Sequence, residues 1–276
     1  MILHKCATID TLHCETAPYD GIEIQLLQNS ECKPEDFFQE NVFSVHSLLD
    51  TSAGYDVDIA DMTDYTLDNI YRAFKFADEI GKFQGKQIGV VLHTSLGYSG
   101  YVKYNLIKDV SFRLGSALNT YQNTFVLIEN STEHTFDGED TARVAVEIKN
   151  SVNPVIGNRI FSVLDTTHAW ITSKRLGILY NQNEDKYFEE YFKAYAESGL
   201  CKEIHFANCI DWGNSFDTHG VDFRDGVDDE FFNKICQLIH KYLPDTVLCI
   251  EVREEDYHKP MAYSHIYNKL RRWVPK

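Results

Sequence analysis

The sequence lacks three features that mark large classes of proteins: cysteine pairs, long apolar runs and an excess of basic residues. Its seven cysteines are odd in number, scattered and never arranged as Cys-x-x-Cys, which excludes a zinc ribbon and argues against a disulfide framework. No stretch of about 18 apolar residues occurs, and the first residues contain no apolar leader segment. We therefore expect a cytoplasmic protein that has no membrane partner.

The charge balance narrows the range of partners further. With 26 basic and 42 acidic residues, the formal net charge is −16. Such a chain has no surplus of cations with which to neutralise phosphates, so a general binder of nucleic acid or of anionic membranes is disfavoured. Phosphate chemistry stays open, because bound divalent cations can supply positive charge locally.

Length and patterning both favour a single barrel. The 276 residues fit a (β/α)8 barrel, which needs about 250, and no long linker or low-complexity segment divides the chain. We therefore expect one domain over residues 1–276. Short apolar runs predict strands at 2–8, 21–27, 42–46, 87–93, 124–129, 160–165, 203–207 and 246–251. Amphipathic segments predict helices at 64–81, 101–121, 140–152, 183–199 and 228–243, and a closing helix in the tail after residue 251.

Alternating strands and helices imply parallel pairing with right-handed crossovers, and eight such strands imply an α/β fold of the TIM-barrel type. Asp64 and Asp228 are predicted helix N-caps, and Gly81 and Gly199 predicted C-caps. Only about a dozen residues separate the first two strands, so the first βα unit is expected to be shortened. A doubly wound open sheet is disfavoured because no glycine-rich phosphate turn follows the first strand.

Chemistry-bearing residues recur where the predicted strands end. Six consecutive strands carry a histidine or a carboxylate at or near their C-terminal end, which is the catalytic face of a TIM barrel. These six residues are His46, His93, Glu129, Asp165, His205 and Glu251. His168 follows Asp165 in an Asp-Thr-Thr-His step, and Asp217 and His219 lie in the loop after the seventh strand.

Taken singly, each of these residues is better explained as a turn former, a cap or a hydrogen-bonded strand end. Taken together they are not, because burying two aspartates, two glutamates and five histidines in one mouth is costly without cations between them. Mixed imidazole and carboxylate ligands suit zinc, manganese or iron. The pattern predicts a site for divalent metal ions.

The pieces SVH, VLIEN, LDTTHA, IHFAN, DTHG and CIE, between about residues 42 and 252, resemble the endonuclease IV type of apurinic/apyrimidinic endonuclease. This is AP endonuclease family 2, within the xylose-isomerase-like TIM barrels. The resemblance implies a trinuclear zinc site and hydrolysis of a phosphodiester by hydroxide attack on phosphorus, with Glu129 as the catalytic residue that positions the hydroxide. The implied ligands are His46, His93 and Glu129 for one ion, Glu129, Asp165, His205 and Glu251 for the second, and His168, Asp217 and His219 for the third.

The sequence does not decide between several substrates. The segment QNSECKPEDFFQE carries one lysine among several acids where the family is polar and arginine-bearing, and Ser-Leu-Leu after His46 lacks the family's tyrosine. DNA with an abasic site, a smaller phosphodiester and a nucleotide are therefore all candidates. Sugar or sugar-phosphate isomerases and epimerases of the same superfamily keep only the set Glu129, Asp165, His205 and Glu251 around one ion, and they supply the alternative function. A silent binding barrel has little support.

Overall fold

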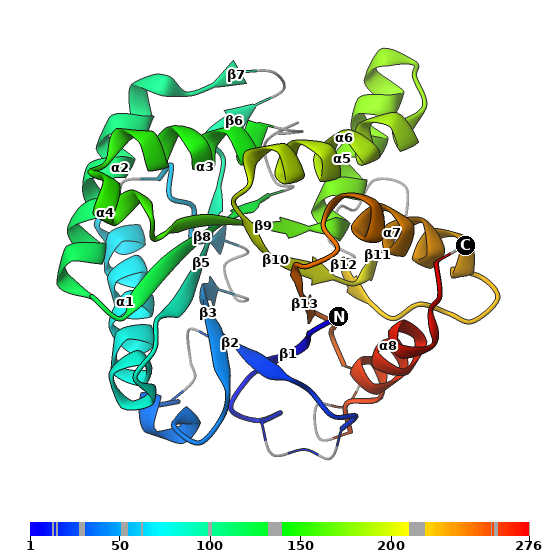
Figure 1. Ribbon diagram of the computed structural model, residues 1–276, viewed down its shortest axis with the longest axis horizontal. Helices are drawn as coiled ribbons and strands as arrows, with labels where there is room; N and C mark the ends of the chain where they lie inside the picture. Colours follow the sequence, from blue (N-terminus) through cyan, green and yellow to red (C-terminus); the bar gives the residue numbers. More distant parts are fainter. Residues whose placement is uncertain are drawn as a thin grey trace.

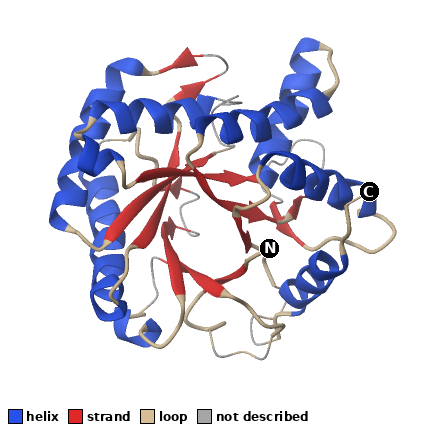
Figure 2. Cartoon of the chain, viewed as in Figure 1, coloured by secondary structure: helices blue, strands red, loops and turns tan. Residues whose placement is uncertain are grey.

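Parallel strands close into a barrel at the centre of the protein (Figures 1 and 2). The computed structural model describes residues 1–12, 14, 16–27, 31–50, 55–61, 63–98, 101–131, 140–209, 219–254, 256 and 259–275. The barrel strands are β1 (Leu3–Ala7), β2 (Gly21–Leu27), β3 (Val42–Asp50), β5 (Ile88–Thr94), β8 (Thr124–Asn130), β9 (Ile160–Asp165), β10 (Cys201–Phe206) and β13 (Val247–Ile250). They pair in the order β2-β1-β13-β10-β9-β8-β5-β3, and a β2–β3 pairing closes the ring. The predicted (β/α)8 barrel is confirmed.

Short antiparallel strands extend the C-terminal ends of three barrel strands. β4 (Tyr55–Asp56) pairs with the end of β3, and β6 (Gly97–Tyr98) pairs with β7 (Tyr101–Val102) just after β5. β11 (Asn208–Cys209) pairs with β12 (His219–Val221) just after β10. These additions all lie at the end of the barrel where the predicted site residues are found.

Helices cover most of the outside of the barrel, as Figure 2 shows, while loops lie beside β1 and β2. They are α1 (Asp64–Gln84), α2 (Tyr104–Thr120), α3 (Asp140–Ser151), α4 (Pro154–Gly157), α5 (Thr166–Tyr180), α6 (Glu184–Ser198), α7 (Asp229–Tyr242) and α8 (Met261–Arg272). The five predicted helices and the closing helix are present, whereas the short α4 and the longer α5 were not predicted. No helix occurs among the described residues between β1 and β2, as expected, and only the 3₁₀ turn η1 (Pro34–Phe37) lies between β2 and β3. Within the described part of the chain, no helix combines the length and apolarity needed to span a membrane.

Two of the four predicted caps are wrong, and both lie on α1. The N-cap is Thr63, whose hydroxyl accepts the backbone N–H of Thr66, rather than Asp64. The helix runs past Gly81 to end at Gly85, which adopts φ 66°. Gly81 is needed for close packing instead, since a Cβ there would lie 2.6 Å from the backbone oxygen of Asn123. The caps at Asp228 and Gly199 are confirmed.

The interior of the barrel is divided into an apolar and a polar part. The apolar part consists of Val91, Phe125, Leu127 and Val163, with Phe43 and Phe161 packed against them. The polar part contains His4, Glu23, Ser44 and Glu203, all buried. Ser44 on β3 contacts Glu203 on β10, nearly opposite in the ring, so this contact crosses the barrel. Outward-facing aliphatic side chains of the strands pack against the helices in two larger clusters.

Arg159, at the start of β9, joins three elements through the backbone. Its guanidinium donates to the carbonyls of Leu118 (2.8 Å), Tyr121 (2.7 Å) and Thr124 (2.7 Å). The first two carbonyls end α2, where a positive charge is also favourable for the helix dipole. The arginine therefore holds α2, β8 and β9 together.

We predict that Arg159→Met lowers the free energy of unfolding by about 2–3 kcal/mol, because three partly buried carbonyls lose a charged donor. Urea denaturation followed by circular dichroism measures the change. Arg72→Met, at an exposed position of α1, is the matched control and should stay within about 0.5 kcal/mol of the wild type. Equal stabilities of the two variants would show that the guanidinium contacts contribute nothing.

Candidate metal centre

The ends of the barrel strands bring seven of the nine predicted site residues together. His46 lies on β3, His93 on β5, Glu129 on β8, Asp165 on β9 and His205 on β10. His168 lies in the first turn of α5, and Glu251 directly follows β13. All are buried except Glu251, whose side chain is 17% exposed. Asp217 and the side chain of His219 lie outside the described residues, so the third predicted ion keeps only His168 among the described ligands.

Glu129 occupies the middle of this group. Its Oε2 lies 3.1 Å from Nε2 of His46 and 3.3 Å from Nε2 of His93. Its Oε1 lies 3.1 Å from Nδ1 of His205 and 3.8 Å from Nδ1 of His168. The carboxylate is fully buried, and four imidazoles from four different elements surround it.

Two sets of donor atoms share Glu129, and a third set, made of His46, His205 and Glu251, overlaps with both. His46, His93 and Glu129 form the first set, and Glu129, Asp165, His205 and Glu251 form the second; within each set the donor atoms lie within 4.8 Å of one another. The first and second sets match the ligands predicted for the first two ions. Imidazole nitrogens and carboxylate oxygens in such clusters suit zinc, manganese or iron. The residues therefore fit divalent ions chemically, and their roles as metal ligands stay a prediction.

Backbone carbonyls orient two of the histidines. Nδ1–H of His46 donates to the carbonyl of Ser47 (3.0 Å), and Nδ1–H of His168 donates to the carbonyl of Asn130 (2.8 Å). In the neutral ring this leaves the lone pair on Nε2, which in His46 faces Glu129. Metal-binding histidines are commonly held in this way by a hydrogen bond from their second nitrogen.

The Asp-Thr-Thr-His step is built on a helix N-cap. Oδ1 of Asp165 accepts the backbone N–H of His168 (2.7 Å), which starts α5 directly at the end of β9. The side chain of Asn130 bonds the backbone N–H and C=O of Asp165 (2.8 and 3.0 Å) and so ties β8 to β9. Asp165 is thus both a structural cap and a member of a donor set, and the cap fixes where His168 lies.

Glu23 is a site residue that the sequence reasoning missed. Its Oε2 lies 3.2 Å from Nε2 of His205, while Nδ1 of the same ring faces Glu129 and Glu251 (3.1 and 3.0 Å). A carboxylate behind a histidine fixes the direction in which the other nitrogen points. The strand GIEIQLL alternates apolar Ile22 and Ile24 with Glu23, so the period of two could have placed this carboxylate inside the barrel.

In the centre, negatively charged carboxylates lie beside imidazoles that carry protons. Burial disfavours a charged His46, but the hydrogen bond to Glu129 and that group's charge outweigh this and raise the pKa of His46 to about 9. Burial likewise opposes ionisation of Glu251, yet the charge of His205 and its hydrogen bond lower the pKa of Glu251 to about 2. Protons on the histidines therefore neutralise the carboxylates, and cations would compete with these protons.

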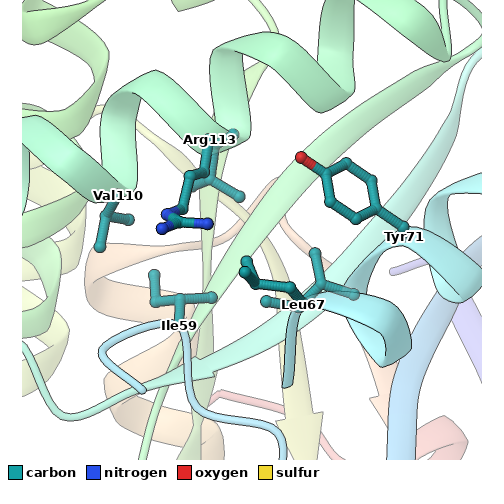
Figure 3. A pocket seen from close by; sticks show the side chains of 7 residues that line it. Ile59, Leu67, Tyr71, Val110 and Arg113 are labelled. Carbon is teal, nitrogen blue, oxygen red and sulfur yellow. The ribbon is translucent and has the colours of Figure 1, made fainter. Parts of the chain in front are cut away.

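A small hollow on the outer surface does not belong to this centre. It lies between α1 and α2 and is lined by Ile59, Leu67, Ile70, Tyr71, Val110, Arg113 and Leu114 (Figure 3). Its walls are mostly aliphatic and include none of the donor residues. We assign it no function.

No family model and no curated protein matches the sequence. The fold resembles the IolI protein that binds a zinc atom, with a TM-score of 0.57 at 14% identity over 98% of this chain and 96% of that one. It also resembles a xylose isomerase domain protein from Planctomyces limnophilus, with a TM-score of 0.60 at 11% identity over 98% and 94% of the two chains. Protein SMc04130 from Sinorhizobium meliloti 1021 gives 0.53 at 13% identity over 97% and 96%. The chain thus shares the TIM-barrel fold of these proteins, and these likenesses do not assign it to the endonuclease IV type.

We predict that Glu129→Gln removes at least one divalent ion per chain, because the shared carboxylate belongs to both donor sets. Elemental analysis of the purified protein measures the metal content. Glu230→Gln, at an exposed position of α7, is the control and should bind as much metal as the wild type. An unchanged content in Glu129→Gln would exclude the carboxylate as a ligand.

We also predict that the metal affinity of the centre rises with pH up to about 9, where His46 loses its proton in the cation-free protein. Only a neutral imidazole can ligate a cation, so each displaced proton raises the association constant about tenfold per pH unit. Competition with a chromophoric chelator at several pH values below 9 measures this slope. An affinity independent of pH over this range would contradict the prediction.

Proposed function

We propose that this protein is a metal-dependent phosphodiester hydrolase whose centre holds at least two divalent ions, zinc foremost. The observation that carries the proposal is the first donor set, in which His46 and His93 approach Glu129 from β3 and β5. An isomerase or epimerase that uses one ion needs only Glu129, Asp165, His205 and Glu251. His168, with Asp217 and His219, would hold a third ion.

Divalent ions at this centre would supply Lewis acidity and lower the pKa of water toward about 7. The described side chains account for positioning. Glu129 belongs to both the first and the second donor set. Its carboxylate is therefore suited to orient an attacking water toward the phosphorus of the substrate. His205 is held by Glu23 from behind, and His46 and His168 by backbone carbonyls, so the donors are already oriented before a substrate binds.

The surrounding charge is consistent with cations as the groups that attract phosphate. Among the residues that the structure describes, no lysine or arginine forms an ion pair with any of the seven site side chains. The formal net charge of −16 also opposes approach of a polyanion. A phosphodiester would therefore depend on bound cations for its neutralisation.

The negative net charge also favours a small substrate over a long nucleic acid. Long DNA would meet an acidic surface, whereas a small phosphodiester or a nucleotide carries less charge to repel. DNA with an abasic site stays in the proposal because of the resemblance of the ligand pieces to the endonuclease IV type. Both kinds of molecule are therefore candidate substrates.

A sugar or sugar-phosphate isomerase or epimerase is the second candidate. It is favoured by the compact set Glu129, Asp165, His205 and Glu251, which would be sufficient for one ion. The two functions differ in what they require of His93, which belongs to the first donor set and not to this one.

We predict that the metal-loaded protein hydrolyses at least one member of a panel of phosphodiesters, including a duplex with a synthetic abasic site, and that His93→Ala lowers this rate by about 100-fold or more. The variant should keep one ion in the four-residue set. His240→Ala, on the exposed face of α7, is the control and should keep full activity. Isomerisation of a sugar that persists in His93→Ala, without phosphodiester hydrolysis by the wild type, would establish the second candidate instead.

A further inference from the structure

A second group of potential metal ligands lies deeper in the barrel than the centre described above. It consists of Glu23 on β2, Glu203 on β10 and Cys249 on β13, whose donor atoms lie within 4.8 Å of one another. Glu203 and Cys249 each precede a member of the upper sets by two residues, which places them one layer further inside. All three side chains are fully buried.

Several polar atoms in this layer have no hydrogen-bond partner. Oε1 of Glu23, Oε1 of Glu203 and Nδ1 of His4 are buried and unsatisfied. The last two lie 3.8 Å apart, so the imidazole nitrogen of His4 is directed at the carboxylate. Unsatisfied buried polar atoms are rare and costly, and three at one place indicate a missing partner.

The charges in this layer point to the kind of partner. Two carboxylates share one hydroxyl, because Oγ of Ser44 lies 3.1 Å from Oε2 of Glu23 and 3.0 Å from Oε2 of Glu203. A hydroxyl has one hydrogen to donate, so it cannot satisfy both groups. No lysine or arginine in the described ranges forms an ion pair with either glutamate. A cation among their remaining oxygens would balance the buried charge.

We propose that Glu23, Glu203, Cys249 and His4 bind one additional metal ion of the zinc class inside the barrel. Two carboxylates, a thiolate and an imidazole provide four donors, which is the number that closed structural zinc sites use. The thiolate favours zinc over magnesium or calcium. Since the other oxygen of Glu23 bonds Nε2 of His205, the inner ion would also fix a residue of the upper centre. The inner site does not depend on the proposed hydrolase function.

Cobalt substitution tests this site separately from the upper one, because none of the described upper donors is a cysteine. Protein produced in medium with cobalt as the added transition metal should show a sulfur-to-cobalt charge-transfer band in the near ultraviolet. Cys249→Ser should lose the band. Cys209→Ser is the control and should keep it, since Cys209 lies on β11 beyond the inner layer. Absence of the band in the wild type, or its survival in Cys249→Ser, would overturn the proposal.

Native mass spectrometry supplies the second readout. Glu203→Gln should carry one ion fewer than the wild type while keeping the upper ions. Glutamine closely matches a protonated glutamate in shape, so an unchanged ion count would show that a proton balances this carboxylate and that no inner ion exists. Glu129→Gln should show the reverse: it should lose upper ions and retain the charge-transfer band. Failure of the upper centre and failure of the inner site therefore give different results.

Discussion

The fully buried carboxylate of Glu129 is the constraint on which the rest of the centre depends. A charged group without access to water must be compensated, and here four histidines from β3, β5, α5 and β10 lie within 4 Å of it. Protons on those rings can neutralise the carboxylates, and so can divalent cations. The centre can therefore bind divalent cations, but these cations must displace protons from the histidine rings.

Closure of the barrel makes this arrangement possible. All barrel strands except β13 carry a buried histidine or carboxylate, and the parallel register places the ends of neighbouring strands at one level. His93 is paired in register with Glu129, and Asp165 with His205. The short antiparallel strands and the two hydrogen bonds from the Asn130 side chain to the backbone of Asp165 add contacts at the same end. The local structure around the donors is thus held by backbone contacts as well as by the site itself.

The barrel and most of the donor residues could be predicted from the sequence, because strand ends are marked by a change from apolar to polar residues. His46, His93 and Glu129 stand at such changes, and the structure brings them together. The helix α5 was missed because Thr166 and Thr167 are β-branched and its apolar residues do not follow one face; its start is dictated instead by the cap at Asp165. Gly81 was misjudged as a cap because only the tertiary contact with Asn123 shows its role.

The polar layer beneath the centre was harder to foresee. Glu23 and Glu203 lie within strands rather than at strand ends. A carboxylate within a strand is usually assigned to the face that points to solvent. Their burial follows from contacts between strands far apart in the sequence, such as Ser44 with Glu203, and a linear pattern does not contain such contacts. Residues 210–218, including Asp217, lie outside the described chain, so the third predicted ion, like the extent of the domain, stays a prediction.

Anomalous diffraction from crystals of the zinc-loaded protein, collected on both sides of the zinc absorption edge, tests the central claim most directly. We predict separate zinc peaks on either side of Glu129, one near His46 and His93 and one near Asp165, His205 and Glu251. A fully loaded crystal with a single peak at the four-residue set would contradict the multinuclear centre and leave a one-metal site.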